Sequence, residues 1–236
     1  MALARVPFLL LAAAGTWLML TPPQPPAPRA ERQQLQGTER LFGKLVRIKA
    51  FAWKTSVIAT LLSEALVLIF SFAGLFPPSL DRPLRATPNP TAAYALTPTV
   101  VLASIVTLLA GLLRLACYRA LGPFFTFELA LRPRHRLVTR GPYATVRHPS
   151  YVAVMSGIVA TLLLHFGRGA WFWEAGLAGP RAKAGYALGW VAVEAWALAS
   201  TLARVPQEDA MLRKHFPEEW DRWAAKVRWK LIPGVF

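Results

Sequence analysis

Five apolar segments constrain this chain more than any other feature of its sequence. Each is bounded by charged residues or by proline and glycine, and several approach the roughly 20 residues that a helix needs to cross a hydrocarbon core. Because lipid offers no partners for backbone N–H and C=O groups, we expect these segments to be helical. The sequence therefore predicts an all-α fold, a polytopic membrane helix bundle with about five transmembrane helices. The segments cover residues 6–20, 51–76, 97–119, 150–166 and 184–203.

The composition agrees with membrane segments that are separated by basic loops. Of the 236 residues, 55% are hydrophobic and 17% are charged, which is too apolar for an ordinary soluble domain. The formal net charge is +15, and in a soluble protein such a charge would favour nucleic acid. In a membrane protein, basic loops orient the chain and contact anionic lipid headgroups. We therefore expect membrane lipid as a partner and no nucleic acid.

We divide the chain into three regions. Residues 1–20 form an N-terminal transmembrane segment or signal anchor, with a cleaved signal peptide as the alternative. Residues 21–119 form a membrane region with two spans and two proline-rich loops, at 21–30 and 77–96, where proline interrupts regular structure. Residues 120–236 form the third region, which contains a two-helix hairpin and a C-terminal helix.

Lysine and arginine alternate between heavily and lightly charged connections. They number 6 in 21–50, 2 in 77–96, 5 in 120–149, 3 in 167–183 and 7 in 204–236. By the positive-inside rule, this pattern predicts an N-terminus outside and a C-terminus in the cytoplasm. Residues 120–149 and residues 204–236 then lie on the same cytoplasmic face.

The last segment differs from the spans because its apolar residues form only one stripe. Large apolar side chains recur at helical spacing from Leu212 to Val227, and charged residues fill the other faces. Pro217, followed by Glu218 and Glu219, indicates that a helix starts there, since proline suits the first helical position and acidic residues suit its positive end. We expect a cytoplasmic amphipathic helix that packs on the membrane or on the protein.

The polar run from His135 to Tyr151 directly precedes an apolar segment. One interpretation is an interfacial belt, because arginine, histidine and tyrosine all suit the headgroup level. However, Gly141-Pro142 and His148-Pro149 fix the backbone at two points. A preorganised polar pocket needs such constraint, so a binding site is the second interpretation.

Arg204 and Glu208 follow the last apolar segment and are four residues apart. This spacing places both side chains on one face if the chain is helical there. Pro206 lies between them and would either kink that helix or start the next one. By itself, such a pair is more often a surface ion pair, worth about 0–1 kcal/mol.

Together these motifs resemble the isoprenylcysteine carboxyl methyltransferase family. The resemblance covers roughly residues 120–236 and includes His135-x-Leu-Val-Thr-x-Gly-Pro-Tyr143, Arg147-His-Pro-Ser-Tyr151, Arg204-x-x-x-Glu208 and a closing Leu231-Ile-Pro-Gly234. It implies a membrane enzyme, typically of the endoplasmic reticulum with its active site facing the cytoplasm. Such an enzyme uses S-adenosylmethionine to methylate the C-terminal carboxylate of a prenylated protein or prenylcysteine. The third region would then be a methyltransferase core.

The resemblance also implies roles for individual residues. Arg204 would bind the substrate carboxylate, and Arg204 and Glu208 would be the catalytic pair. The residues that would surround S-adenosylmethionine are His135, Arg136, Leu137, Val138, Tyr143, His148, Pro149, Ser150, Tyr151 and Glu208.

The chain departs from the family pattern at three positions. Glu128 stands where some members have glutamine, Asp209 stands where glutamate is usual, and Pro217 stands where glycine is common. These departures affect the expected geometry of the site but remove no central group.

Three other functions stay open at this point. A methyltransferase for phospholipids or other small lipophilic acceptors would share the cofactor pocket. Sterol reductases, which use NADPH, carry a similar Arg-His-Pro stretch. A non-catalytic membrane scaffold would keep the fold alone. The sequence leaves the oligomeric state undetermined.

Overall fold

The computed structural model describes residues 2–28, 38–75, 94–167, 169–176 and 178–235. Within these ranges the chain forms helices and no β-strands. Five helical segments are long and apolar enough to cross a membrane, which confirms the predicted all-α polytopic bundle. These segments are Ala2–Leu20, Lys44–Phe72, Pro98–Phe124, Pro149–Trp173 and Pro180–His215.

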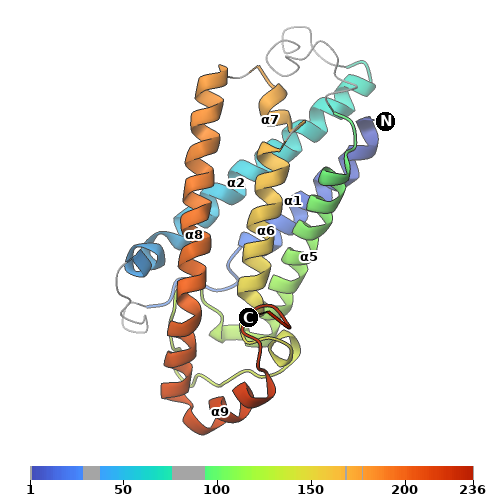
Figure 1. Ribbon diagram of the computed structural model, residues 1–236. Coiled ribbons are helices and arrows are strands. Elements are labelled where there is room, and N and C mark those ends of the chain that lie inside the picture. Colours follow the sequence, from blue (N-terminus) through green and yellow to red (C-terminus); the bar gives the residue numbers. More distant parts are fainter. Residues whose placement is uncertain (1, 29–37, 76–93, 168, 177, 236) are drawn as a thin grey trace.

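Three helices form the centre of the bundle. α1 (Val6–Leu20) packs against α5 (Pro98–Leu121), which also packs against α6 (Pro149–Phe166), and the three lie side by side in Figure 1. α2 (Thr38–Phe72) crosses them obliquely, while α8 (Pro180–His215) contacts α2 and α6 and extends beyond them. Shorter helices are η1 (Ala2–Arg5), η3 (Gly122–Phe124), η4 (Gly141–Ala144), α7 (Trp171–Glu174) and α9 (Pro217–Lys226).

Proline occupies the start of most of these helices. Pro98, Pro149, Pro180 and Pro217 each lie in the first turn, where a backbone N–H would have no partner within the helix. At α5, the Thr97 side chain also accepts a hydrogen bond from the Val100 backbone N–H, at 3.3 Å. The predicted helix start at Pro217 is confirmed.

Two glycines let α1 and α5 approach each other closely. A Cβ atom on Gly15 would lie 2.5 Å from the Thr107 carbonyl oxygen, and one on Gly111 would lie 2.5 Å from the Gly15 carbonyl oxygen. Because these neighbours are backbone atoms, a larger residue would force the helices apart. Small residues commonly serve this purpose in membrane bundles.

Buried ion pairs connect the helices inside the bundle. Arg5 Nε lies 2.6 Å from Glu64 Oε1, and both side chains are almost fully buried. Lys49 Nζ lies 2.7 Å from Glu194 Oε2 and joins α2 to α8. Charged residues are costly in lipid unless they are paired in the protein interior, so these pairs fix which helix faces turn inward.

α8 differs from its predicted form. It runs without interruption from Pro180 to His215 and contains Pro206, so this proline neither ends the helix nor begins another. Next to it, the Gln207 side-chain amide donates to the Ala203 carbonyl oxygen at 3.1 Å. Pro206 has no N–H to donate to the Leu202 carbonyl oxygen, so the helix continues with one backbone hydrogen bond fewer at this point. The predicted loop at 77–96 lies outside the described residues up to residue 93.

Candidate active site

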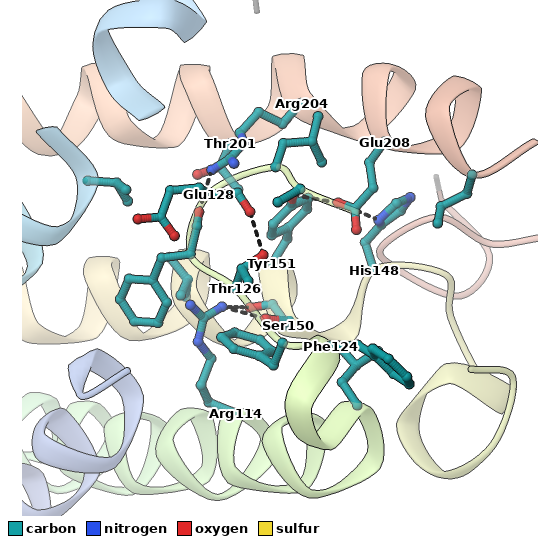
Figure 2. Close-up of a pocket in the computed structure, with 18 of the residues that line it drawn as sticks. Arg114, Phe124, Thr126, Glu128, His148, Ser150, Tyr151, Thr201, Arg204 and Glu208 are labelled. Atoms are coloured by element: carbon teal, nitrogen blue, oxygen red, sulfur yellow. Dashed lines mark hydrogen bonds and ion pairs between the residues drawn. The ribbon is translucent and has the colours of Figure 1, made fainter. Parts of the chain in front are cut away.

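A pocket lies near the α9 end of the bundle, between α5, α6, α8 and the segment that joins α5 to α6. Figure 2 shows side chains from these elements converging on it. Of the eleven predicted site residues, only Pro149, the first residue of α6, is not among the described lining residues. The other ten line it: His135, Arg136, Leu137, Val138, Tyr143, His148, Ser150, Tyr151, Arg204 and Glu208.

Arg204 and Glu208 both reach the pocket from α8, as Figure 2 shows. The Arg204 side chain is buried, and its Nη1 donates to the Phe127 carbonyl oxygen at 3.1 Å. The Tyr151 hydroxyl donates to Glu208 Oε2 at 2.5 Å. The continuous helix therefore confirms the predicted shared face, and hydrogen bonds fix both side chains in place.

His148 lies between two carboxylates. Its Nε2 is 3.0 Å from Asp209 Oδ1, and its Nδ1 is 3.6 Å from Glu208 Oε2. Burial lowers the pKa of His148, but the hydrogen bonds and negative charges of Asp209 and Glu208 outweigh burial and raise it to about 9. The imidazole is therefore cationic at neutral pH and holds the Glu208 carboxylate against Tyr151.

The C-terminal tail holds the backbone of this motif. The Arg147 N–H donates to the Trp229 carbonyl oxygen at 2.9 Å, and the His148 N–H donates to the Lys230 carbonyl oxygen at 2.8 Å. Both acceptors lie just before the closing Leu-Ile-Pro-Gly motif, about 80 residues along the chain. The tail therefore helps to hold the backbone of Arg147 and His148 in position at the site.

His135 contributes an uncharged ring to the pocket wall. Its ring centroid lies 4.8 Å from that of Phe124 and 6.0 Å from that of Phe216. Burial and the nearby His215 lower the pKa of His135, so the ring is neutral at pH 7. Aromatic neighbours and a neutral imidazole form a surface on which a planar base can stack.

Leu137 and Val138 extend this wall toward α9. They pack against a buried cluster that includes Tyr143 and Trp223. The Trp223 indole N–H donates to the Tyr143 carbonyl oxygen at 3.0 Å and fixes α9 against η4. The predicted amphipathic helix, α9, therefore packs Trp223 on the protein. Gly141, the first residue of η4, has φ +62°, a conformation that glycine adopts readily.

The acidic departures from the family pattern both have cationic partners. Glu128 lines the pocket, and its Oε1 accepts from Arg47 Nε at 2.8 Å. Asp209 Oδ2 accepts from Arg147 Nη1 at 2.9 Å, while its other oxygen faces His148. Neither carboxylate is left as an uncompensated charge at the site.

Sequence reasoning missed Arg114, which lines the pocket from α5. Its Nη1 donates to both the carbonyl and the hydroxyl oxygen of Ser150, and its Nε donates to the Tyr118 hydroxyl at 3.1 Å. An ionisable residue inside an apolar run is itself a signal of function in membrane proteins. The run around Arg114 contains this signal, but a span prediction based on mean hydropathy passes over it.

The second omission is the contribution of α2. Lys49 lines the pocket and Arg47 neutralises one of its walls, although the first 100 residues contain no family motif. Only the long-range packing of α2 brings them to the site.

In the comparison with known proteins, one family model matches a part of the chain that includes much of this site. The chain matched no curated protein and no solved structure. The matched residues, 101–172, include nine of the predicted site residues, whereas Arg204 and Glu208 lie outside them but in the same pocket. The family described by the model is the isoprenylcysteine carboxyl methyltransferase (ICMT) family, and the resemblance of this chain to that family is thereby confirmed.

Proposed function

We propose that this membrane methyltransferase transfers a methyl group from S-adenosylmethionine to the C-terminal carboxylate of a prenylated cysteine and forms a methyl ester. The observation that supports this function best is the position of Arg204. Its buried guanidinium lines a pocket that combines charged groups with apolar walls from membrane-spanning helices. Such a pocket suits an acceptor with an anionic head and an apolar tail.

The apolar part of the pocket suits the prenyl group. It is formed by side chains on four of the five candidate membrane spans. A prenyl chain gains roughly 0.8 kcal/mol for each buried CH₂-sized group, so it partitions both into the bilayer and into a pocket of this kind. The residues concerned are Leu20, Val46, Ala50, Val154, Ile158 and Ala197.

The remaining part of the pocket fits S-adenosylmethionine. The wall formed by Phe124, His135, Leu137 and Val138 would hold the adenine ring, and the Glu208 carboxylate would face the cationic groups. When bound, this cofactor supplies a methyl group on a positively charged sulfur, which leaves as a neutral thioether when the acceptor oxygen takes the methyl.

The residues of the chain then act by binding and orientation. A C-terminal carboxylate has a pKa of about 3.5 and is ionised at neutral pH, so the reaction needs no general base. Arg204 would hold that carboxylate through charge-assisted hydrogen bonds. Tyr151 and His148 keep Glu208 in place. Positioning of this kind contributes up to about 7–11 kcal/mol to catalysis.

The direct test is transfer of labelled methyl from S-adenosylmethionine by the purified protein in lipid. A farnesylated cysteine acceptor and a phospholipid acceptor are assayed side by side, with NADPH consumption measured in parallel. A base-labile methyl ester on the cysteine supports the proposal. Methylated phospholipid or oxidised NADPH would replace it with the corresponding alternative, and absence of cofactor binding would favour a scaffold.

In a eukaryotic cell, we propose that the protein lies in the endoplasmic reticulum membrane with the pocket facing the cytoplasm. The basic connections near the pocket support this orientation. Protection of a tag at the C-terminus from protease in sealed microsomes would contradict it.

A further inference from the structure

Arg114 is a buried cation at the pocket without an acidic partner among the described residues. Its side chain is 6% exposed, yet no described carboxylate lies within 4.0 Å of its guanidinium. In contrast, Lys49 and Arg147, which also line the pocket, each form an ion pair. A buried charge normally has a compensating partner, so the environment of Arg114 is unusual.

Neutral groups account for part of the environment of this guanidinium. It lies 5.1 Å from the ring centroid of Phe125 and 5.0 Å from that of Phe127, which are favourable cation–π distances. Ser150 and Tyr118 accept hydrogen bonds from Nη1 and Nε. Nη2 donates no hydrogen bond to a described residue, so the two N–H groups of Nη2 are available to a ligand.

The position of Arg114 indicates which chemical group of a ligand would pair with its guanidinium. Arg114 extends from α5 and Arg204 extends from α8, and they approach the pocket from opposite sides in Figure 2. A guanidinium with free N–H groups matches a carboxylate better than any neutral acceptor. Both ligands of the proposed reaction, S-adenosylmethionine and the prenylcysteine acceptor, carry a carboxylate.

We infer that Arg114 binds a ligand carboxylate in the pocket. The carboxylate belongs either to the acceptor's C-terminus or to the methionyl part of S-adenosylmethionine. The inference rests on the proposed function for the identity of these ligands. Arg114 is thus a second anion-binding residue beside Arg204, and it determines selectivity for carboxylate over neutral analogues.

The test compares each carboxylate ligand with a neutral analogue, in wild type and in Arg114→Gln. The cofactor arm measures equilibrium binding of S-adenosylmethionine and its decarboxylated analogue without an acceptor. The acceptor arm measures N-acetyl-S-farnesylcysteine and its carboxamide. Loss of a charge-assisted hydrogen bond reduces affinity by roughly 10- to 100-fold, and we expect this loss only for the carboxylate member of one pair.

Further variants separate binding from folding. Arg119→Gln removes an exposed arginine from the same helix and should leave both ratios unchanged. Arg114→Lys keeps the charge and should retain part of the carboxylate preference. Wild-type affinity of Arg114→Gln for the neutral analogues shows that its pocket is intact.

The pair that responds identifies the source of the carboxylate. Unchanged ratios for both pairs in Arg114→Gln and Arg114→Lys would overturn the inference. Failure of the proposed function is read separately, as absence of methyl ester formation by the wild-type protein.

Discussion

Arg47 Nε lies 2.8 Å from Glu128 Oε1, and this ion pair joins α2 to a wall of the pocket. The Glu128 side chain is only 5% exposed, and Arg47 also donates to the Gln24 carbonyl oxygen at 3.1 Å. A carboxylate stands here where some relatives of the family have glutamine. The negative charge is tolerated because the N-terminal half of the chain supplies the cation.

This pairing predicts that Arg47→Met destabilises the protein by about 1–3 kcal/mol, because Glu128 would remain buried without its cation. Glu128→Gln should cost less, since an amide needs no counter-charge. The double variant should regain most of the stability lost in Arg47→Met. Unfolding midpoints of all four proteins in one detergent measure the coupling, and strictly additive losses would contradict it.

Replacement of Arg204 should reduce turnover while the protein remains folded. We expect Arg204→Ala to be folded and to lose at least about 30-fold in kcat/KM, because the acceptor carboxylate loses its charge-assisted contact. Arg204→Lys should also be impaired, since a point charge does not reproduce a planar fork. Arg213→Ala, an exposed position on the same helix, is the matched control. Full methylation by Arg204→Ala would exclude the role assigned to Arg204.

The close contact of α1 and α5 predicts that Gly111→Ala destabilises the bundle. The new methyl group would meet the backbone of Gly15, and overpacking of this kind costs about 1–3 kcal/mol. Gly189→Ala in α8 is the matched control, because a Cβ there meets no atom within 4 Å. We expect that control to be neutral or slightly stabilising. Equal unfolding midpoints for both variants would show that the contact at Gly111 relaxes freely.

Local chemistry made much of the fold predictable from sequence. The apolar segments located all five candidate spans, and Pro217 marked the start of α9 because proline suits the first turn of a helix. The same rule left Pro206 ambiguous, since a proline can start a helix or lie within one. In the structure α8 is continuous through Pro206, and Arg204 reaches the Phe127 carbonyl oxygen from it, a contact that spacing does not encode.

The site was predictable only where its residues share one short motif or a family pattern. The run from His135 to Tyr151 met both conditions, and Arg204 and Glu208 met the second. Arg47 met neither, because 81 residues separate it from Glu128 and only the crossing of α2 brings them together. Arg114 was missed for another reason: its only signal is a single charge inside an apolar run, and its partners are rings and hydroxyls that form no motif with it in the sequence.

The C-terminal tail predicts a long-range effect of truncation. Deleting residues 228–236 removes the backbone acceptors of the Arg147 and His148 N–H groups, each worth about 0.5–1.5 kcal/mol. Loosening His148 should weaken S-adenosylmethionine binding several-fold, as measured by equilibrium titration. Arg228→Ala keeps the backbone acceptors and should bind like wild type. Equal affinity of the truncated protein would show that the motif keeps its position without the tail.

His148 predicts how stability depends on pH. Its ordinary pKa of 6.5 is raised to about 9 by Asp209 and Glu208, so the folded protein holds a proton that the unfolded chain releases. The resulting stabilisation is complete below about pH 6.5 and is lost as pH rises through about 9, with an upper limit of roughly 3 kcal/mol. The unfolding midpoint of wild type should therefore fall between pH 7 and about 10. His148→Gln should start lower at pH 7 and fall less, because no imidazolium remains to be lost, and parallel pH profiles would show that other groups control the transition.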